Sequence, residues 1–279
     1  MNAPQTVQPG IYPTMSNEDY HHAPGVSKSG LDLIARSPYL FRNRPRVEPT
    51  RAMLIGSAVH TATLEPELFN DHFAVAPSVD GRTKAGKEML AQFSAECAGK
   101  TVLKEEDGEL IWSIAKAVHA HPVAKNILSD EGQAEMSIFN TDEYTGELVK
   151  VRPDWMVEDC LVDLKTTEDA SAEAFSRACW NFRYYVQAAF YLDVANSQYN
   201  GRFHNFVFIV VEKSPPFQVA VYYADATMIE VGRMAYQQNL ALYSQCKQTD
   251  TWPGLGDERI QPISLPGWAL KNIDMAIAD

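Results

Sequence analysis

Residues 150–167 read KVRPDWMVEDCLVDLKTT, and this stretch decides the fold. Residues 160–165 are apolar and β-branched enough to form a buried strand. A second β-like run, residues 147–152, comes before them, and the acidic pair between the two runs marks a turn. We therefore expect a hairpin that brings Asp154 and Asp163 together at neighbouring strand ends.

The strand at 160–165 presents a carboxylate and an amine to one side. Strand side chains alternate with a period of two, so Asp163 and Lys165 point to the same face. Two carboxylates repel each other unless a cation lies between them, and a hard divalent ion such as Mg²⁺ prefers oxygen ligands. Lys165 could then orient or deprotonate a water and stabilise charge on a phosphate. The alternative is a surface hairpin with solvated charges, but the apolar residues around Asp163 favour a site.

Composition and charge limit the classes of protein to which the chain could belong. It has 279 residues, of which 46% are hydrophobic and 22% charged, and a net charge of −12. Such an acidic chain is not expected to coat nucleic acid by bulk charge, so DNA contacts should be confined to a cleft or channel. We expect a loose segment at 1–10 and a single domain at 11–279.

The four cysteines are scattered, without a C-x-x-C pair. This pattern predicts free thiols in a reducing cytosol and speaks against disulfides, a zinc site or an iron–sulfur cluster. The sequence contains no apolar run of membrane-spanning length and no apolar core of a signal peptide near its start. We therefore expect a cytoplasmic protein without a membrane partner.

Two basic regions upstream are candidate DNA contacts. Ser27 is a plausible N-cap for a helix that Pro38 ends, and with Lys28 it could hold a phosphate; ordinary capping plus a surface lysine is the alternative. A loop containing glycine carries the most basic local cluster, which is either a contact to the DNA backbone or a solvated loop. The basic residues we would test are Lys28, Arg36, Arg82, Lys84 and Lys87.

The helix expected at residues 52–65 contains small residues and one histidine. Gly56 lies among other small and apolar side chains, which predicts close packing, and His60 follows it by one helical turn. A lone histidine on an apolar helix is usually a hydrogen-bonded core residue, and the alternative is a metal ligand.

Three further polar residues fall near the predicted hairpin. Glu135 should lie on an inner strand at 134–139, either as another carboxylate of the site or as a charge at the sheet edge. Gln187 and Tyr191 are four residues apart on a predicted helix and share a face, where they could hold a phosphate and orient the lysine.

These separate signals occur in one order, which resembles a known family of nucleases. Gly56-x-x-x-His60, Pro153-Asp154, Asp163-Leu164-Lys165 and Gln187-x-x-x-Tyr191 together resemble the RecB-type branch of the PD-(D/E)xK nucleases. More closely, the chain resembles the C-terminal nuclease domain of the RecE-type exonucleases (exonuclease VIII) from about residue 10 onward. The stretches that carry this closer resemblance include Ser16–Tyr20, Gly25–Ser29, Leu64–Glu67, Ala85–Glu88, Arg152–Asp154, Asp163–Thr167 and Ser264–Trp268.

The resemblance implies an α/β fold with a restriction-endonuclease-like core, in which helices flank a central mixed sheet. It implies a processive exonuclease that degrades linear double-stranded DNA from 5′ to 3′ and leaves a 3′ single strand. Family members need Mg²⁺, with Mn²⁺ as a substitute. They form rings around DNA, with a tetramer favoured here over a trimer. They are phage or prophage encoded and act beside a RecT-like single-strand annealing protein.

The resemblance also assigns roles to individual positions. His60, Asp154, Asp163 and the backbone carbonyl of Leu164 match metal ligands, and Lys165 matches the catalytic lysine. Gln187 and Tyr191 match the helix that supports the site, and Glu135 resembles a glutamate of the site in the related lambda exonuclease. The second acid of the family is often glutamate, and here Asp163 takes its place.

Two other functions remain open at this stage. A Cas4-like or repair-type nuclease would act on single strands, although the missing cysteine cluster speaks against its iron–sulfur versions. A DNA-end binder or recombination scaffold with the same fold would no longer cut, but the complete set of His60, Asp154, Asp163 and Lys165 speaks against that reading.

Overall fold

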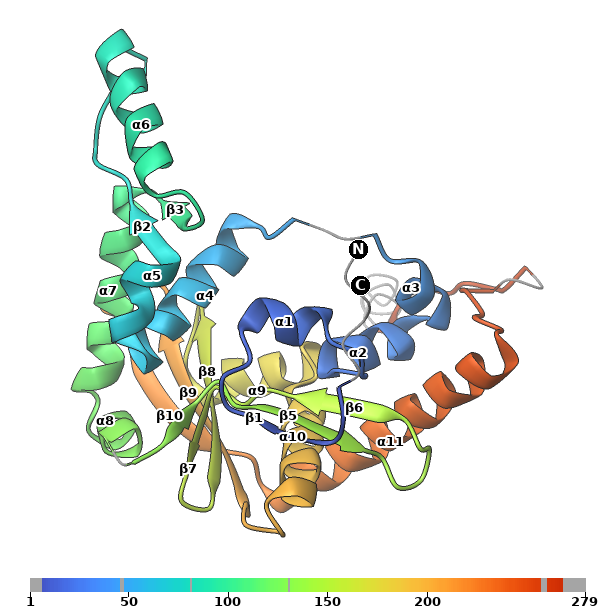
Figure 1. Cartoon of the computed structure of the whole chain (residues 1–279). Coiled ribbons are helices and arrows are strands. Elements are labelled where there is room, and N and C mark those ends of the chain that lie inside the picture. Colours follow the sequence, from blue (N-terminus) through green and yellow to red (C-terminus); the bar gives the residue numbers. More distant parts are fainter. Residues whose placement is uncertain (1–6, 46–47, 81, 130, 257–259, 268–279) are drawn as a thin grey trace, which may run out of the picture.

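A five-stranded mixed sheet forms the centre of the protein (Figure 1), in the order β10-β9-β8-β7-β4. The computed structural model describes residues 7–45, 48–80, 82–129, 131–256 and 260–267. The strands of the central sheet are β4 (Gln133–Ala134), β7 (Trp155–Val157), β8 (Cys160–Thr167), β9 (Asn205–Glu212) and β10 (Val219–Tyr223). β8 pairs with β9 in parallel, and the other pairings are antiparallel.

The predicted hairpin is present, but its first strand differs from the prediction. β7 and β8 pair from Val157↔Cys160 to Trp155↔Val162, and Glu158 begins the tight turn with φ 43°. The expected partner run at 147–152 instead forms β6 (Leu148–Val151), which belongs to another sheet. The proline and aspartate after β6 separate it from β7, so the chain changes sheets just before Asp154.

Helices cover both faces of the central sheet, because its strands are apolar on both sides. On one face, Val162, Leu164 and Ile209 pack with α4 (Arg51–Leu64) and α7 (Glu105–Ala120). On the other, Leu161 and Phe208 pack with three helices. These are α9 (Ala172–Asn181), α10 (Tyr184–Gln198) and α11 (Ala226–Thr249). The prediction of a mixed sheet flanked by helices is confirmed.

A smaller antiparallel sheet of order β1-β5-β6 lies beside the first. It contains β1 (Gly10–Tyr12) and β5 (Ser137–Thr141) with β6. Short helices surround it: α1 (Asn17–His22), α2 (Lys28–Arg36) and α3 (Pro38–Asn43). The buried Lys150 on β6 donates hydrogen bonds of 2.6 Å to the carbonyls of Tyr20 and Ala23, which fixes the end of α1 against this sheet.

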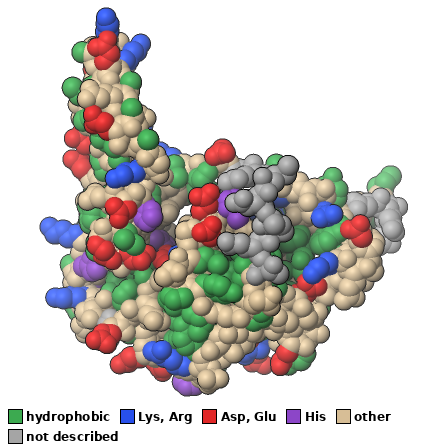
Figure 2. All heavy atoms as spheres, in the orientation of Figure 1, with side chains coloured by type: hydrophobic (Ala, Val, Ile, Leu, Met, Phe, Trp, Pro, Cys, Tyr) green, Lys and Arg blue, Asp and Glu red, His purple; other side chains and the backbone are tan. Residues whose placement is uncertain are grey.

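An arm projects from the body beyond α4 and α7 (Figures 1 and 2). It contains the parallel pair β2 (Phe73–Val75) and β3 (Thr101–Leu103), and the helix α6 (Lys84–Glu96) between them. Gly86 is the one residue of α6 that is buried. The remaining short helices near its base are η1 (Pro66–Leu68), α5 (Phe69–His72) and α8 (Pro122–Ser129).

Some expectations fall on residues that the structure does not describe. Residues 1–6 of the segment expected to be loose lie outside the described residues, whereas Val7 packs beside Tyr20 and Phe139. Trp268, part of the resemblance, also lies outside them. None of the described helices has both the length and the apolar character needed to cross a membrane.

Candidate metal centre and active site

One histidine and two carboxylates lie close together at the start of β7. Each of His60, Glu135 and Asp154 offers a ligand atom, and these three atoms lie within 4.8 Å of one another. His60 Nδ1 is 3.3 Å from Asp154 Oδ2. The residues are distant in sequence, so their meeting results from the packing of α4 on the sheet.

Asp154 is held by the strand next to it. β7 pairs with β8 only as far as Val162, so the backbone of Leu164 has no β7 partner. Its N–H donates instead to Asp154 Oδ2 at 2.7 Å. Because the N–H and C=O of a strand residue leave on the same side, the Leu164 carbonyl also points toward Asp154. This direction is compatible with its predicted role as a ligand.

Asp163 and Lys165 lie on one face of β8, as predicted. Asp163 is 1% exposed, and Gln187 from α10 donates a hydrogen bond to its Oδ1. Its other oxygen, Oδ2, forms an ion pair of 2.5 Å with the Lys165 amine, but receives no hydrogen bond of acceptable direction from the described residues. A buried carboxylate oxygen in this state can still accept a bond from a further ligand.

Glu135 occupies a bend between two sheets, which corrects the prediction of an inner strand. Residue 134 ends β4, residue 137 begins β5, and Glu135 between them has φ 52°, in the left-handed region. Arg152 fixes its side chain through an ion pair of 2.7 Å between Nε and Oε2. Arg152 also donates to Ser137 Oγ and, at 3.0 Å, to the carbonyl of Met15. Arg152, itself anchored on Met15 and Ser137, thus holds Glu135 toward the site.

The buried charges perturb one another strongly. Burial would lower the pKa of His60, but Asp154, with smaller contributions from Glu135 and Asp163, outweighs burial and raises the pKa to about 9. Burial and the charge of Asp154 raise the pKa of Glu135 to about 7, and burial also raises the pKa of Asp163. Burial alone would lower the pKa of Lys165, but Asp163 and Asp154 outweigh it and raise the pKa. At neutral pH the cluster therefore combines protonated His60 and Lys165 with ionised carboxylates at a buried place.

A cleft gives access to this cluster. It has a volume of about 630 Å³ and includes His60, Glu135 and Arg152 in its wall. Gly56 also lines it, and a Cβ at this glycine would meet nothing within 4 Å. The expected close packing of this helix is confirmed at Ala58 and Val59, which face the core, whereas Gly56 faces the cleft.

Comparison with known proteins places the chain in a family. Residues 39–260 match the family described as "PDDEXK-like domain of unknown function (DUF3799)". The chain belongs to this PDDEXK-like family. No curated protein matches the sequence. A crystal structure named "Putative exonuclease" from Eubacterium rectale superposes with a TM-score of 0.59 at 14% identity, covering 92% of this chain and 98% of that one. At this identity the match shows the fold, and the family places it in the PD-(D/E)xK nuclease superfamily.

The residues of this PDDEXK-like domain fit a divalent cation. Nucleases of this superfamily generally depend on one, and hard cations prefer carboxylate oxygens. Asp154, Asp163 and Glu135 supply such oxygens, and the buried Asp163 Oδ2 lies 2.5 Å from the Lys165 amine. Burial, and after it the charge of Asp154, raises the pKa of Glu135, and a cation would counter both by favouring the ionised carboxylate.

The residues predicted to support the site from α10 differ in their contacts. Gln187 touches Asp163 directly. Tyr191 packs edge-on against Phe206 with ring centroids 6.2 Å apart. Burial raises the pKa of Tyr191 well above its usual range, and nearby acids, including Asp163 and Asp154, add to the effect. Tyr191 is therefore a neutral neighbour of the cluster.

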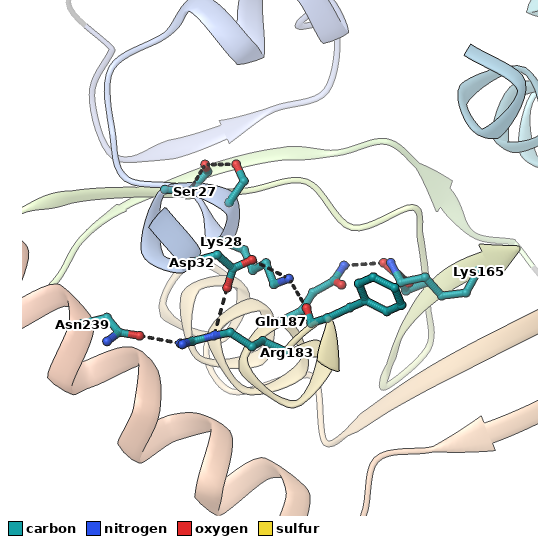
Figure 3. A network of polar contacts seen from close by, with 11 residues as sticks. Ser27, Lys28, Asp32, Lys165, Arg183, Gln187 and Asn239 are labelled. Carbon is teal, nitrogen blue, oxygen red and sulfur yellow. Dashed lines mark hydrogen bonds and ion pairs between the residues drawn. The ribbon is translucent and has the colours of Figure 1, made fainter. Parts of the chain in front are cut away.

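The predicted DNA contacts are divided between two places. Lys28 lies close to the active site, where its amine pairs with Asp32 at 2.8 Å and donates a hydrogen bond of 2.7 Å to the carbonyl of Phe182 (Figure 3). Ser27 caps α2 by accepting from the N–H of Gly30 at 3.3 Å, and Arg36 is exposed at the other end of that helix.

The other basic cluster lies on the arm. Arg82 is exposed just before α6 and pairs with Asp80, while Lys84 and Lys87 are exposed in the first turns of α6. The expectation of a loop was therefore wrong for these two lysines, because Thr83 caps α6 and the helix begins at Lys84.

Sequence reasoning missed three neighbours of the site. Arg152, next to the Pro-Asp pair, holds Glu135. The ring of Tyr184 lies under the Lys165 amine, 4.6 Å from its centroid. Arg183 pairs with Asp32 at 3.1 Å. A signal existed only for Arg152, which lies two residues before Asp154 in the motif itself.

Proposed function

We propose that the protein is a divalent-metal-dependent exonuclease that degrades linear double-stranded DNA from 5′ to 3′ and leaves a 3′ single strand. The observation that supports this best is the cluster of His60, Glu135 and Asp154, of which His60 and Glu135 line a cleft, beside the ion pair of Asp163 and Lys165. Membership of a nuclease superfamily and the name of the Eubacterium rectale structure agree with it.

In this proposal the ligands are His60, Asp154, Asp163 and the Leu164 carbonyl, with Glu135 beside them. A divalent cation, Mg²⁺ or Mn²⁺, would polarise the scissile phosphate and lower the pKa of a water beside it. In hydrolysis the water oxygen bonds to phosphorus, the bond to the 3′ oxygen breaks, and that oxygen takes up a proton.

Lys165 contributes positive charge where the phosphate becomes more negative. Asp163 and Asp154 favour the protonated amine, so Lys165 stabilises this charge rather than acting as a base. Gln187 fixes the orientation of Asp163, and Arg152 that of Glu135. Both act as positioning residues, because each bonds a carboxylate of the site.

The same proposal includes the assembly and its partners. A ring-shaped homo-oligomer, a tetramer or a trimer, would let an acidic protein enclose DNA, with the basic residues confined to the channel. The 3′ strand left behind would be the substrate of a RecT-like annealing protein in phage-type recombination.

The test is digestion of a linear duplex labelled at one 5′ or one 3′ end, with Mg²⁺, beside single-stranded and closed circular DNA. Wild type should release the 5′ label first and leave the circle intact. Lys165→Ala should be inactive, and Lys125→Ala, which removes an exposed lysine of α8 outside the cleft, should be unaffected.

Other outcomes would replace the proposal. Preferential digestion of single strands would indicate a Cas4-like nuclease. Binding of DNA ends without release of nucleotides would indicate a scaffold. An active Lys165→Ala protein would show that the site is elsewhere.

A further inference from the structure

Two large aromatic side chains are exposed where α9 meets α10. Phe182 is 61% exposed and Trp180 is 68% exposed. Each is stacked on a tyrosine of α10. Phe182 lies 5.6 Å from the ring of Tyr184, and Trp180 lies 5.5 Å from the ring of Tyr185. Each exposed ring thus has one supported face and one face open to solvent.

Positive charge gathers around only one of these two stacks. The amines of Lys165 and Lys28 lie 4.6 and 5.7 Å from the ring centroid of Tyr184. Lys28 also donates a hydrogen bond of 2.7 Å to the carbonyl of Phe182. In the described part of the chain, no cation lies over Trp180 or Tyr185.

The turn that carries Phe182 is held in place by several contacts (Figure 3). Arg183, the next residue, has φ 55° and begins α10. Its guanidinium lies 3.1 Å from Asp32 of α2 and donates a hydrogen bond of 2.5 Å to Asn239 of α11. With the bond from Lys28, three links from two other helices fix this turn. The backbone that carries the exposed ring is therefore fixed, and Tyr184 supports one face of the ring.

We propose that the free face of Phe182 stacks on an unpaired base of the DNA strand being cut, while Lys28 contacts the phosphate next to that base. This inference rests on the proposed function, because it places the strand between Lys165 and Phe182. Aromatic rings stack on any base, so such a contact tolerates every sequence, and amines position phosphates without reading sequence. A nuclease that digests DNA of any sequence needs contacts of this kind.

The experiment compares Phe182→Ala with Trp180→Ala, which removes an equally exposed, tyrosine-stacked ring that lacks the cations. The substrates are 5′-phosphorylated duplexes, either intact or with one abasic residue at the first, second or third position from the 5′ end. The kcat/KM of nucleotide release is measured for each. Thermal unfolding and sedimentation confirm that each variant is folded and in the wild-type oligomeric state, and Phe182→Trp serves as the conservative replacement.

Phe182→Ala should lower kcat/KM on intact DNA by about tenfold or more. Phe182→Trp should retain activity, and Trp180→Ala should match wild type. At one position, removal of the base should slow wild type and Trp180→Ala but cause no further loss in Phe182→Ala.

Equal activity of the two alanine variants, or an abasic effect that persists without Phe182, would overturn the inference alone. A change of oligomeric state in Phe182→Ala with unchanged cutting would do the same and assign the ring to a protein interface. Wild type that releases no nucleotides would instead refute the proposed function.

Discussion

The substitution Gly232→Ala tests how closely α10 approaches α11. A Cβ at Gly232 would lie 1.9 Å from the carbonyl oxygen of Tyr185 and 3.0 Å from the Cβ of Ala189, both on α10. The carbonyl belongs to the backbone and cannot rotate away, so the two helices would have to separate. Forcing an extra group into a well-packed core costs about 1–3 kcal/mol.

The higher helix propensity of alanine opposes this loss of stability, so the experiment needs a control variant in which only propensity changes. Replacing a glycine within a helix by alanine normally stabilises it by about 1 kcal/mol. Gly56 of α4 is such a position, because a Cβ there meets nothing within 4 Å. We expect Gly232→Ala to lower the free energy of unfolding by up to about 2 kcal/mol after this gain is subtracted, because the clash is with backbone. Gly56→Ala should raise it by about 0.5–1 kcal/mol.

The assay is urea unfolding followed by circular dichroism, with the midpoint and slope fitted for both variants and wild type. Opposite signs for the two variants would support the close approach of the helices. If both substitutions stabilise the protein to the same extent, α10 and α11 do not meet at Gly232. The support that α10 gives to Asp163 through Gln187 would then need another explanation.

Three further predictions concern the site and the arm. Gln187→Leu leaves a buried carboxylate oxygen without its donor, and we expect metal affinity or activity to fall about 10–100-fold, measured as rate against Mg²⁺ concentration. Mg²⁺ at a hundred times its Kd should raise the free energy of unfolding of wild type by about 2.7 kcal/mol, and its Tm should rise accordingly. Asparagine is a weaker ligand than aspartate, so the Tm of Asp154→Asn should rise less with Mg²⁺. The double variant Arg82→Ala/Lys84→Ala removes two exposed side chains, so its Tm should equal that of wild type. It should release fewer nucleotides per binding event, measured by diluting the reaction into competitor DNA. Normal processivity would refute a DNA contact on the arm.

Local sequence signals predicted much of the fold. The Ser27 cap and the turn between β7 and β8 depend on neighbouring residues, so they could be recognised in the sequence. The alternation along β8 placed Asp163 and Lys165 on one face for the same reason.

Features that depend on distant pairings were missed. The run before Asp154 has the composition of a strand, but composition does not say which sheet it joins, and β6 joined the smaller one. Glu135 adopts a left-handed backbone that its residue type does not favour, and Arg152 stabilises it. The link from Lys28 to Phe182 spans 154 residues, and no local pattern signals it.

The arm that carries α6 also affects how the protein moves in solution. A compact chain of 279 residues would have a radius of gyration of roughly 19 Å. A projecting helix with a single buried residue adds mass far from the centre and little interior. X-ray scattering from the monomer should therefore give a larger radius and a distance distribution with a tail at long separations. Its frictional coefficient should exceed that of a sphere of equal mass.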